Sequence, residues 1–303
     1  MPLLTFGLGA DGSVPLDWSR LGVTQLGWVP SIMMLTAGGL YLWGAWRIGR
    51  LEGSPWSRRR TGAFFGGLVV TFAAIEGVVG AYDDQVFYAH MIQHLMLVMV
   101  AGPLFAMGAP LDLLQRASSG RVRGAVDAGM RSRVAEVIGH PIAGFVAYAV
   151  LIPFTHLTSF YNYTLTNDLV HDAEHLGFLV VGYLFWRPVV GIEPSRHPLS
   201  PALQLLYLAL AVPVDTFTGL ALTATTHELF SFYNSFTRGW GPSLVTDLHI
   251  GGSIMWVGGD TLMFIAMIPV ATRWVRVEEQ RTRELDAALD RIESGGGSKW
   301  SED

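Results

Sequence analysis

The sequence QVFYAHMIQHLMLVMVAGPLFAMG occupies residues 85–108 and is apolar apart from a few side chains near its start, among them His90 and His94. A transmembrane helix needs about 20 predominantly apolar residues, so this stretch predicts a helix that spans a membrane. Six further apolar runs of similar length lie at residues 26–46, 62–82, 138–157, 172–191, 201–224 and 249–272. The sequence therefore predicts an all-α, polytopic bundle of seven transmembrane helices in a lipid bilayer.

The composition agrees with a membrane protein and excludes several classes of site. Half of the 303 residues are hydrophobic and 15% are charged, against roughly 25% charged in an average soluble domain. The net charge of −5 offers no positive field for nucleic acid. The chain has no cysteine, which excludes disulfides, thiolate zinc sites and iron–sulfur clusters. The single lysine, Lys299, lies in the tail, so a Schiff base inside the bundle is excluded as well.

The cations lie mainly on one side of the predicted spans. Eighteen of the twenty Lys and Arg residues fall after the first, third and fifth spans or in the C-terminal tail, and the other two are Arg20 and Arg238. Because cytoplasmic loops carry the excess of Lys and Arg, the N-terminus is expected outside and the C-terminus in the cytoplasm. The predicted organisation is an extracytoplasmic segment (1–25), a membrane domain (26–276) and a cytoplasmic tail (277–303) that is partly helical and then disordered.

With this orientation, seven of the nine histidines fall in one layer at the outer membrane face, while His140 and His197 lie inside. The layer consists of His90, His94, His156, His171, His175, His227 and His249. Two pairs in it have i,i+4 spacing, which puts both rings on one helix face about 6 Å apart. That spacing suits chelation of a metal ion. For His227, in a polar loop, we favour an ordinary interfacial residue.

Histidine is a frequent ligand of copper and zinc, and carboxylates accompany the layer as ligands or as acceptors that orient an imidazole. Met91 and Met255 are the methionines nearest to it, and a thioether is a soft ligand for Cu(I). The expected metal ligands are His90, His94, His156, His171, His175, Asp247 and His249, with Glu174, Asp172, Met91 and Met255 as further candidates.

Three ionisable residues lie within the predicted spans: Glu76, Asp215 and Asp260. Such a residue is costly in a membrane and is a functional candidate by default. A buried hydrogen bond that holds two helices together is an equally good interpretation. The sequence leaves both open.

Several stretches resemble the motifs of a known family. They are His90-Met-Ile-Gln-His94-Leu-Met-Leu with Gly102-Pro103 and Gly108-Ala109-Pro110-Leu111, then Pro153-Phe-Thr-His156, Asn167-Asp-Leu-Val-His171-Asp-Ala-Glu-His175, Phe185-Trp186-Arg-Pro188-Val189 and Asp247-Leu-His249-Ile-Gly251-Gly252-Ser-Ile-Met255-Trp256. In this order, over residues 60–275, the chain resembles the CtaG family, the membrane-integral cytochrome c oxidase assembly factors that accompany caa3-type oxidases in Gram-positive bacteria.

The resemblance implies a seven-helix protein of the bacterial plasma membrane that handles copper for one of the oxidase's copper centres. Its partners would be the oxidase subunits and a copper donor protein. His90, His94, His156, His171, His175 and Asp247 match family positions, whereas at His249 the family often has Gln. The protein would not be an enzyme.

Three other functions fit some of the residues. His171-Asp-Ala-Glu174-His175 has the H-x-x-E-H pattern of certain zinc peptidases, so a seven-helix intramembrane zinc hydrolase is the main alternative. Histidines from two helices are also the axial ligands of haem in electron carriers. A copper or proton-coupled transporter would use Glu76, Asp215 and Asp260 as a relay.

Overall fold

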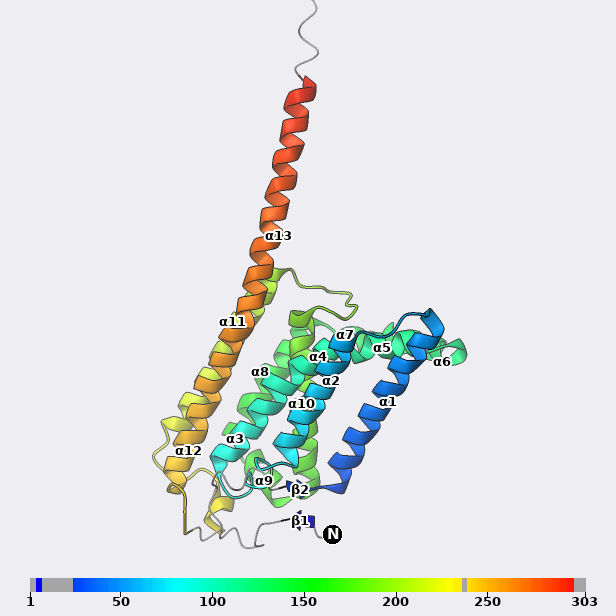
Figure 1. Cartoon of the computed structure of the whole chain (residues 1–303). Helices are drawn as coiled ribbons and strands as arrows, with labels where there is room; N and C mark the ends of the chain where they lie inside the picture. Colours follow the sequence, from blue (N-terminus) through cyan, green and yellow to red (C-terminus); the bar gives the residue numbers. More distant parts are fainter. Residues whose placement is uncertain (1–3, 7–23, 236–238, 297–303) are drawn as a thin grey trace, which may run out of the picture.

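The computed structural model describes residues 4–6, 24–235 and 239–296, and over these residues the chain is built from helices (Figure 1). In chain order they are α1 (Trp28–Glu52), α2 (Arg58–Ile75), α3 (Phe87–Leu95), the π-helical turn η2 (Met96–Ala101), α4 (Gly102–Gly108), α5 (Pro110–Ala117), α6 (Gly120–Met130), α7 (Arg133–Ile138), α8 (Pro141–Leu157), α9 (Phe160–Thr166), α10 (Asp168–Val190), α11 (Pro201–Thr223), the 3₁₀ turn η3 (Ser231–Ser235), α12 (Leu244–Ser253), the π-helical turn η4 (Ile254–Gly258) and α13 (Gly259–Gly296). The only departure among the described residues is a short antiparallel pairing of β1 (Leu4–Phe6) with β2 (Thr24–Leu26). The helical fold class is confirmed.

Three described helical segments are long and apolar enough to cross a membrane: Phe87–Ala117, Pro201–Thr223 and Leu244–Ile292. A fourth candidate is the pair α8 and α9, which meet at a bend of 75°. Ionisable side chains lower the hydropathy of α2 and α10, as the three arginines that open α2 and Glu174 in α10 illustrate. The membrane character is therefore supported, while the count of seven spans stays a prediction.

The second predicted span, 62–82, ends earlier than expected. α2 stops at Ile75, and the chain runs in tight turns to the start of α3. A Cβ atom on Gly80 would lie 1.9 Å from the carbonyl oxygen of Ile75, so only glycine fits this turn. The turns place Asp83 beside the first turns of α3 rather than at the end of a long helix.

The helical part of the C-terminal tail is continuous with the last apolar helix. α12, η4 and α13 follow one another without a break from Leu244 to Gly296, so the expected tail helix continues the last apolar helix. Beyond the bundle this helix stands alone (Figure 1), and its side chains from Thr272 to Ala287 are exposed.

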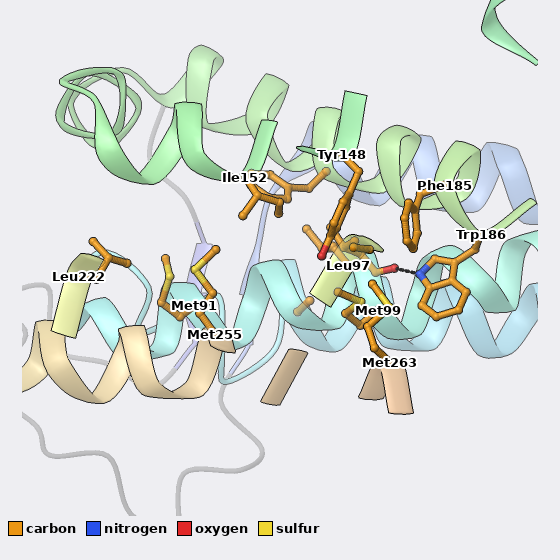
Figure 2. Close-up of a cluster of buried hydrophobic side chains, with 14 of the residues drawn as sticks. Met91, Leu97, Met99, Tyr148, Ile152, Phe185, Trp186, Leu222, Met255 and Met263 are labelled. Atoms are coloured by element: carbon orange, nitrogen blue, oxygen red, sulfur yellow. Dashed lines mark hydrogen bonds between the residues drawn. The ribbon is translucent and has the colours of Figure 1, made fainter. Parts of the chain in front are cut away.

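α10, which carries His171 and His175, touches η2 and α4, the continuation of α3, through glycine. A Cβ atom on Gly102 would lie 2.8 Å from the carbonyl carbon of Gly182, and one on Gly182 would lie 2.9 Å from Cα of Val98. Small residues that let backbones approach are typical of helix contacts in membranes. In the hydrophobic core, the Trp186 indole donates a hydrogen bond of 2.9 Å to the Val98 carbonyl (Figure 2). α10 is thereby fixed against η2 and α4.

This contact predicts the effect of adding one methyl group. Gly182→Ala is expected to lower the unfolding temperature of the purified protein in detergent, because overpacking a tight contact costs about 1–3 kcal/mol. The matched control is Gly177→Ala on the same helix, where a Cβ meets nothing within 4 Å. Alanine favours the helix by up to about 1 kcal/mol over glycine, so the control should be as stable as the wild type or more stable. Equal unfolding temperatures for the two variants would contradict the contact.

Candidate metal centre

Five of the predicted histidines meet at one end of the bundle. Ring centroids lie 4.2 Å apart for His90 and His94, 5.3 Å for His90 and His171, 5.1 Å for His94 and His156, and 4.3 Å for His171 and His175. His90 is fully buried, and at most 5% of His94, His156 or His175 is exposed. We call these five residues the histidine cluster.

Local sequence determines where along its helix each histidine pair lies. α3 begins at Phe87 and α10 at Asp168, so each pair lies within the first two turns of its helix. Asn167 caps α10 by accepting a hydrogen bond from the backbone amide of Val170. The expected i,i+4 geometry is therefore present on two adjacent helices. His156 joins from the end of α8, just before the bend into α9.

Two carboxylates complete the cluster. Glu174 Oε2 lies 3.9 Å from His90 Nε2, and Asp83 Oδ2 lies 3.8 Å from His171 Nε2. Two groups have ligand atoms within 4.8 Å of one another: His90, His94 and Glu174, and Asp83, His90 and His171. Each is close enough to hold a metal ion after small side-chain movements, because metal–nitrogen bonds are about 2 Å long.

The cluster contains an unusual number of buried polar atoms that lack a hydrogen-bond partner among the described residues. They are Nδ1 and Nε2 of His90, Nε2 of His94, Nε2 of His171, Nδ1 of His175 and both carboxylate oxygens of Glu174. Each such atom costs about 1–3 kcal/mol. A bound cation would remove much of this cost, and these atoms are the ones that coordinate metals.

A hydrogen-bonded chain fixes the tautomer of His94. His156 Nδ1 lies 2.8 Å from the carbonyl oxygen of Ile152, which can only accept, so Nδ1 carries the proton. His156 Nε2 therefore accepts from His94 Nδ1 at 3.1 Å. His94 Nε2 is left with a free lone pair in the cluster. His156, predicted as a ligand, thus orients the ring of His94.

A second chain fixes His175. Gln93 Nε2 donates to the Ala74 carbonyl at 3.0 Å and to Asp83 Oδ2 at 2.7 Å, which leaves Oε1 of Gln93 as an acceptor. His175 Nε2 donates to that oxygen at 2.8 Å. The lone pair of His175 is therefore on Nδ1, one of the unpartnered atoms.

Gln93 and the ligand position of Asp83 were not among the predicted site residues. Gln93 lies between the two histidines of His90-Met-Ile-Gln-His94 and three residues after His90, which is a helical spacing that points to the same face. Asp83 is one of the carboxylates that accompany the predicted histidine layer, but its place beside His171 depends on the turns after α2. Burial raises the pKa of Asp84 to about 6, and burial together with the Asp84 carboxylate raises the pKa of Asp83.

Two predicted ligands have other partners. Asp247 accepts hydrogen bonds of 3.0 Å from the backbone amides of both Phe87 and Tyr88, at the start of α3. His249 Nε2 donates to the Thr225 carbonyl at 2.7 Å. Neither residue belongs to the two described ligand groups.

Of the further candidates, Glu174 lies in the cluster, Asp172 lines a cavity, and the two methionines lie in the apolar core. Asp172 and His175 line a cavity of about 310 Å³ between α1, α2 and α10, and Met33 and Met34 are also in its lining. Met91 and Met255 are buried in the hydrophobic core (Figure 2).

The remaining histidines lie apart from the cluster. His227 is exposed. At the opposite end of the bundle, the rings of His140 and His197 are 4.6 Å apart, and His140 Nδ1 accepts from the Ile142 amide at the start of α8. His140 and His197, which were not predicted as ligands, therefore do not contribute to the cluster.

The three ionisable residues within the predicted spans each accept a hydrogen bond from another helix. Ser31 donates to Glu76 at 2.7 Å, Tyr148 to Asp215 at 2.5 Å and Thr216 to Asp260 at 2.7 Å. These bonds join α1 to α2, α8 to α11 and α11 to α13. The contacts favour the interpretation as helix-joining hydrogen bonds.

The bonds of Asp247 predict graded losses of stability. Asp247→Ala leaves the buried amide of Phe87 and the partly buried amide of Tyr88 without this acceptor, at about 1–3 kcal/mol for a buried group, whereas Asp247→Asn keeps one carbonyl oxygen there. The unfolding temperature in detergent should fall in the order wild type, Asn variant, Ala variant. An Ala variant as stable as the wild type would contradict a role in holding the start of α3.

Comparison with known proteins gives a family and several relatives. A family model described as cytochrome c oxidase caa3 assembly factor (Caa3_CtaG) matches residues 39–277. An uncharacterized protein of Mycobacterium bovis and one of Mycobacterium tuberculosis are each 28% identical over 259 residues, which is 81% of this chain and 39% of the relative. One of Mycobacterium leprae is 27% identical over 249 residues, 80% of this chain and 38% of the relative. The chain thus spans well under half the length of these relatives. No solved structure matches.

Proposed function

The chain belongs to the cytochrome c oxidase caa3 assembly factor family, and we propose that it serves oxidase assembly by binding copper in the histidine cluster. Membership of this family supports a role in oxidase assembly in general terms. The copper, the cluster as its site and the transfer to the oxidase are the parts that we propose.

The observation that carries this proposal is the set of buried, unpartnered nitrogen and oxygen atoms on four histidines and Glu174. Imidazole suits copper and zinc, whereas a set of carboxylates alone would suit harder ions. Since the chain has no cysteine, copper would be held by imidazole with carboxylate help. Zinc is the alternative ion for the same atoms.

A carrier fits this site better than a hydrolase. The family indicates assembly, and the H-x-x-E-H hydrolase interpretation gains no support from it. We therefore propose a non-enzymatic role, in which copper passes from a donor protein to an oxidase subunit.

The proposal includes the topology that the cation distribution predicts. Seven spans in the bacterial plasma membrane, with the N-terminus outside, would put the histidine cluster at the outer face. A donor protein outside the cytoplasm would reach it there.

Reporter fusions test this topology. Alkaline phosphatase inserted after residue 227 should be active, because that loop is expected outside, whereas the same enzyme fused after residue 296 should be inactive. A fluorescent protein that folds only in the cytoplasm should give the reverse pattern. The opposite result at either position would overturn the proposed orientation.

The copper proposal predicts the effect of removing one histidine pair. The double variant His90→Ala/His94→Ala should lose its copper. It removes two of the three ligands in the group with Glu174, and His90 is also a ligand in the group with Asp83 and His171. The caa3 oxidase activity of the same cells should fall with it. Metal analysis of the purified protein and oxygen consumption by the membranes measure the two effects.

The matched control is His197→Ala/His227→Ala, which removes two exposed histidines outside the cluster. It should keep both copper and oxidase activity, and all variants should be compared at equal membrane abundance. If the His90/His94 variant keeps its copper, the cluster is not the site. If it loses copper while the oxidase matures normally, copper binding does not serve assembly.

A further inference from the structure

We propose that the histidine cluster holds two metal ions at once and that His90 contributes a ligand to both. This inference rests on the proposed function, because it takes the cluster to be the metal site. It adds the number of ions, their separate ligand sets and the residue that joins them.

The first observation is that the two ligand groups overlap in one residue only. One consists of His90, His94 and Glu174, and the other of Asp83, His90 and His171. We call them the inner and the outer position, because His94 is 4% exposed, the Glu174 side chain is fully buried and the His171 side chain is 14% exposed. Each position has its own carboxylate and its own second histidine, so a single ion cannot use both sets fully.

The second observation concerns the shared ring. His90 is fully buried, and both of its nitrogens lack a hydrogen-bond partner within the described chain. Buried imidazoles normally have at least one nitrogen bonded, as His94, His156 and His175 do. A ring that coordinates one ion through each nitrogen satisfies both atoms. When the second ion binds, the N–H proton of His90 leaves to solvent and the ring becomes an imidazolate between the two ions.

The inner position is prepared by the fixed tautomer of His94. Its Nδ1 proton is used in the bond to His156, so the lone pair on Nε2 is free without loss of a proton. Glu174 supplies two further unpartnered oxygens. Neutral imidazole nitrogen and ionised carboxylate are the forms in which these groups bind metal.

Charge supports two ions as well. The ion pairs described for Asp83 and Glu174 are those with His171 and His90, and a buried carboxylate is costly unless it is paired or coordinates a metal. Asp83 belongs to the outer position and Glu174 to the inner. One ion in each position would coordinate its own carboxylate, whereas a single ion in either position would leave the carboxylate of the other without a metal.

The test counts ions in the purified full-length chain after removal of any affinity tag. The protein is loaded with Cu(II), freed of loosely bound metal and analysed for copper per chain. We expect two copper ions in the wild type and one in each of two variants, Asp83→Asn/His171→Ala for the outer position and His94→Ala/Glu174→Gln for the inner. His90→Ala should fall below one, because it removes a ligand from both.

Electron paramagnetic resonance gives a second readout. Two Cu(II) ions joined by an imidazolate couple, so the wild type should show much less signal than its copper content requires. The single-position variants should show a full mononuclear signal. Unfolding temperatures check that each variant is folded.

The outcomes separate the two proposals. One copper per chain in the wild type, or an uncoupled signal from two, would overturn the shared site and leave the proposed function standing. No copper in the wild type would overturn both. If the outer and inner variants both lost all copper while folded, one site with mixed ligands would replace the two positions.

Discussion

The contact between glycines on α4 and α10 is the constraint on which the rest of this structure depends. With no Cβ on Gly102 or Gly182, the two backbones touch, and the Trp186 indole fixes the same helices by its bond to Val98. The register of α10 against α3, η2 and α4 follows from this contact, since α3 runs through η2 directly into α4. Two histidine pairs that are more than 75 residues apart in sequence therefore lie at one level.

Two hydrogen-bonded chains fix which nitrogen carries the proton in His94 and in His175, and each leaves its ring with one free lone pair. Backbone carbonyls of Ile152 and Ala74 are the fixed ends of the two hydrogen-bonded chains. Such acceptors cannot change role, so they determine every donor and acceptor between themselves and the cluster. A metal site prepared in this way needs little rearrangement of its ligands.

Sequence reasoning found the parts of the site that depend on local spacing and failed where they depend on distant packing. The i,i+4 pairs His90/His94 and His171/His175 could be predicted, because helix geometry alone puts each pair on one face. Asp83 was expected near the layer, but its place beside His171 could not be predicted, since it depends on the turns that include Gly80. Asp247 was read as a ligand because carboxylates do bind metals, but its bonds to two amides of α3 depend on how α12 packs against that helix. The helical class and the family followed from apolar runs and motif order. Three described segments, or four with the bent pair α8 and α9, are long and apolar enough to be spans, so the count of seven stays a prediction.

The continuity of α12, η4 and α13 gives one helix two very different environments. Its first part packs in the bundle, where Met255, Met263 and Val270 are buried. From Arg276 to Ala287 its side chains are exposed, and it relies on local pairs such as Arg283 with Glu279, which stabilise a helix by only about 0.2–0.5 kcal/mol each. Most helical stability in proteins comes from packing. The exposed part of α13 therefore unfolds and refolds locally while the bundle stays folded. Its amide hydrogens exchange with solvent long before those of the buried turns.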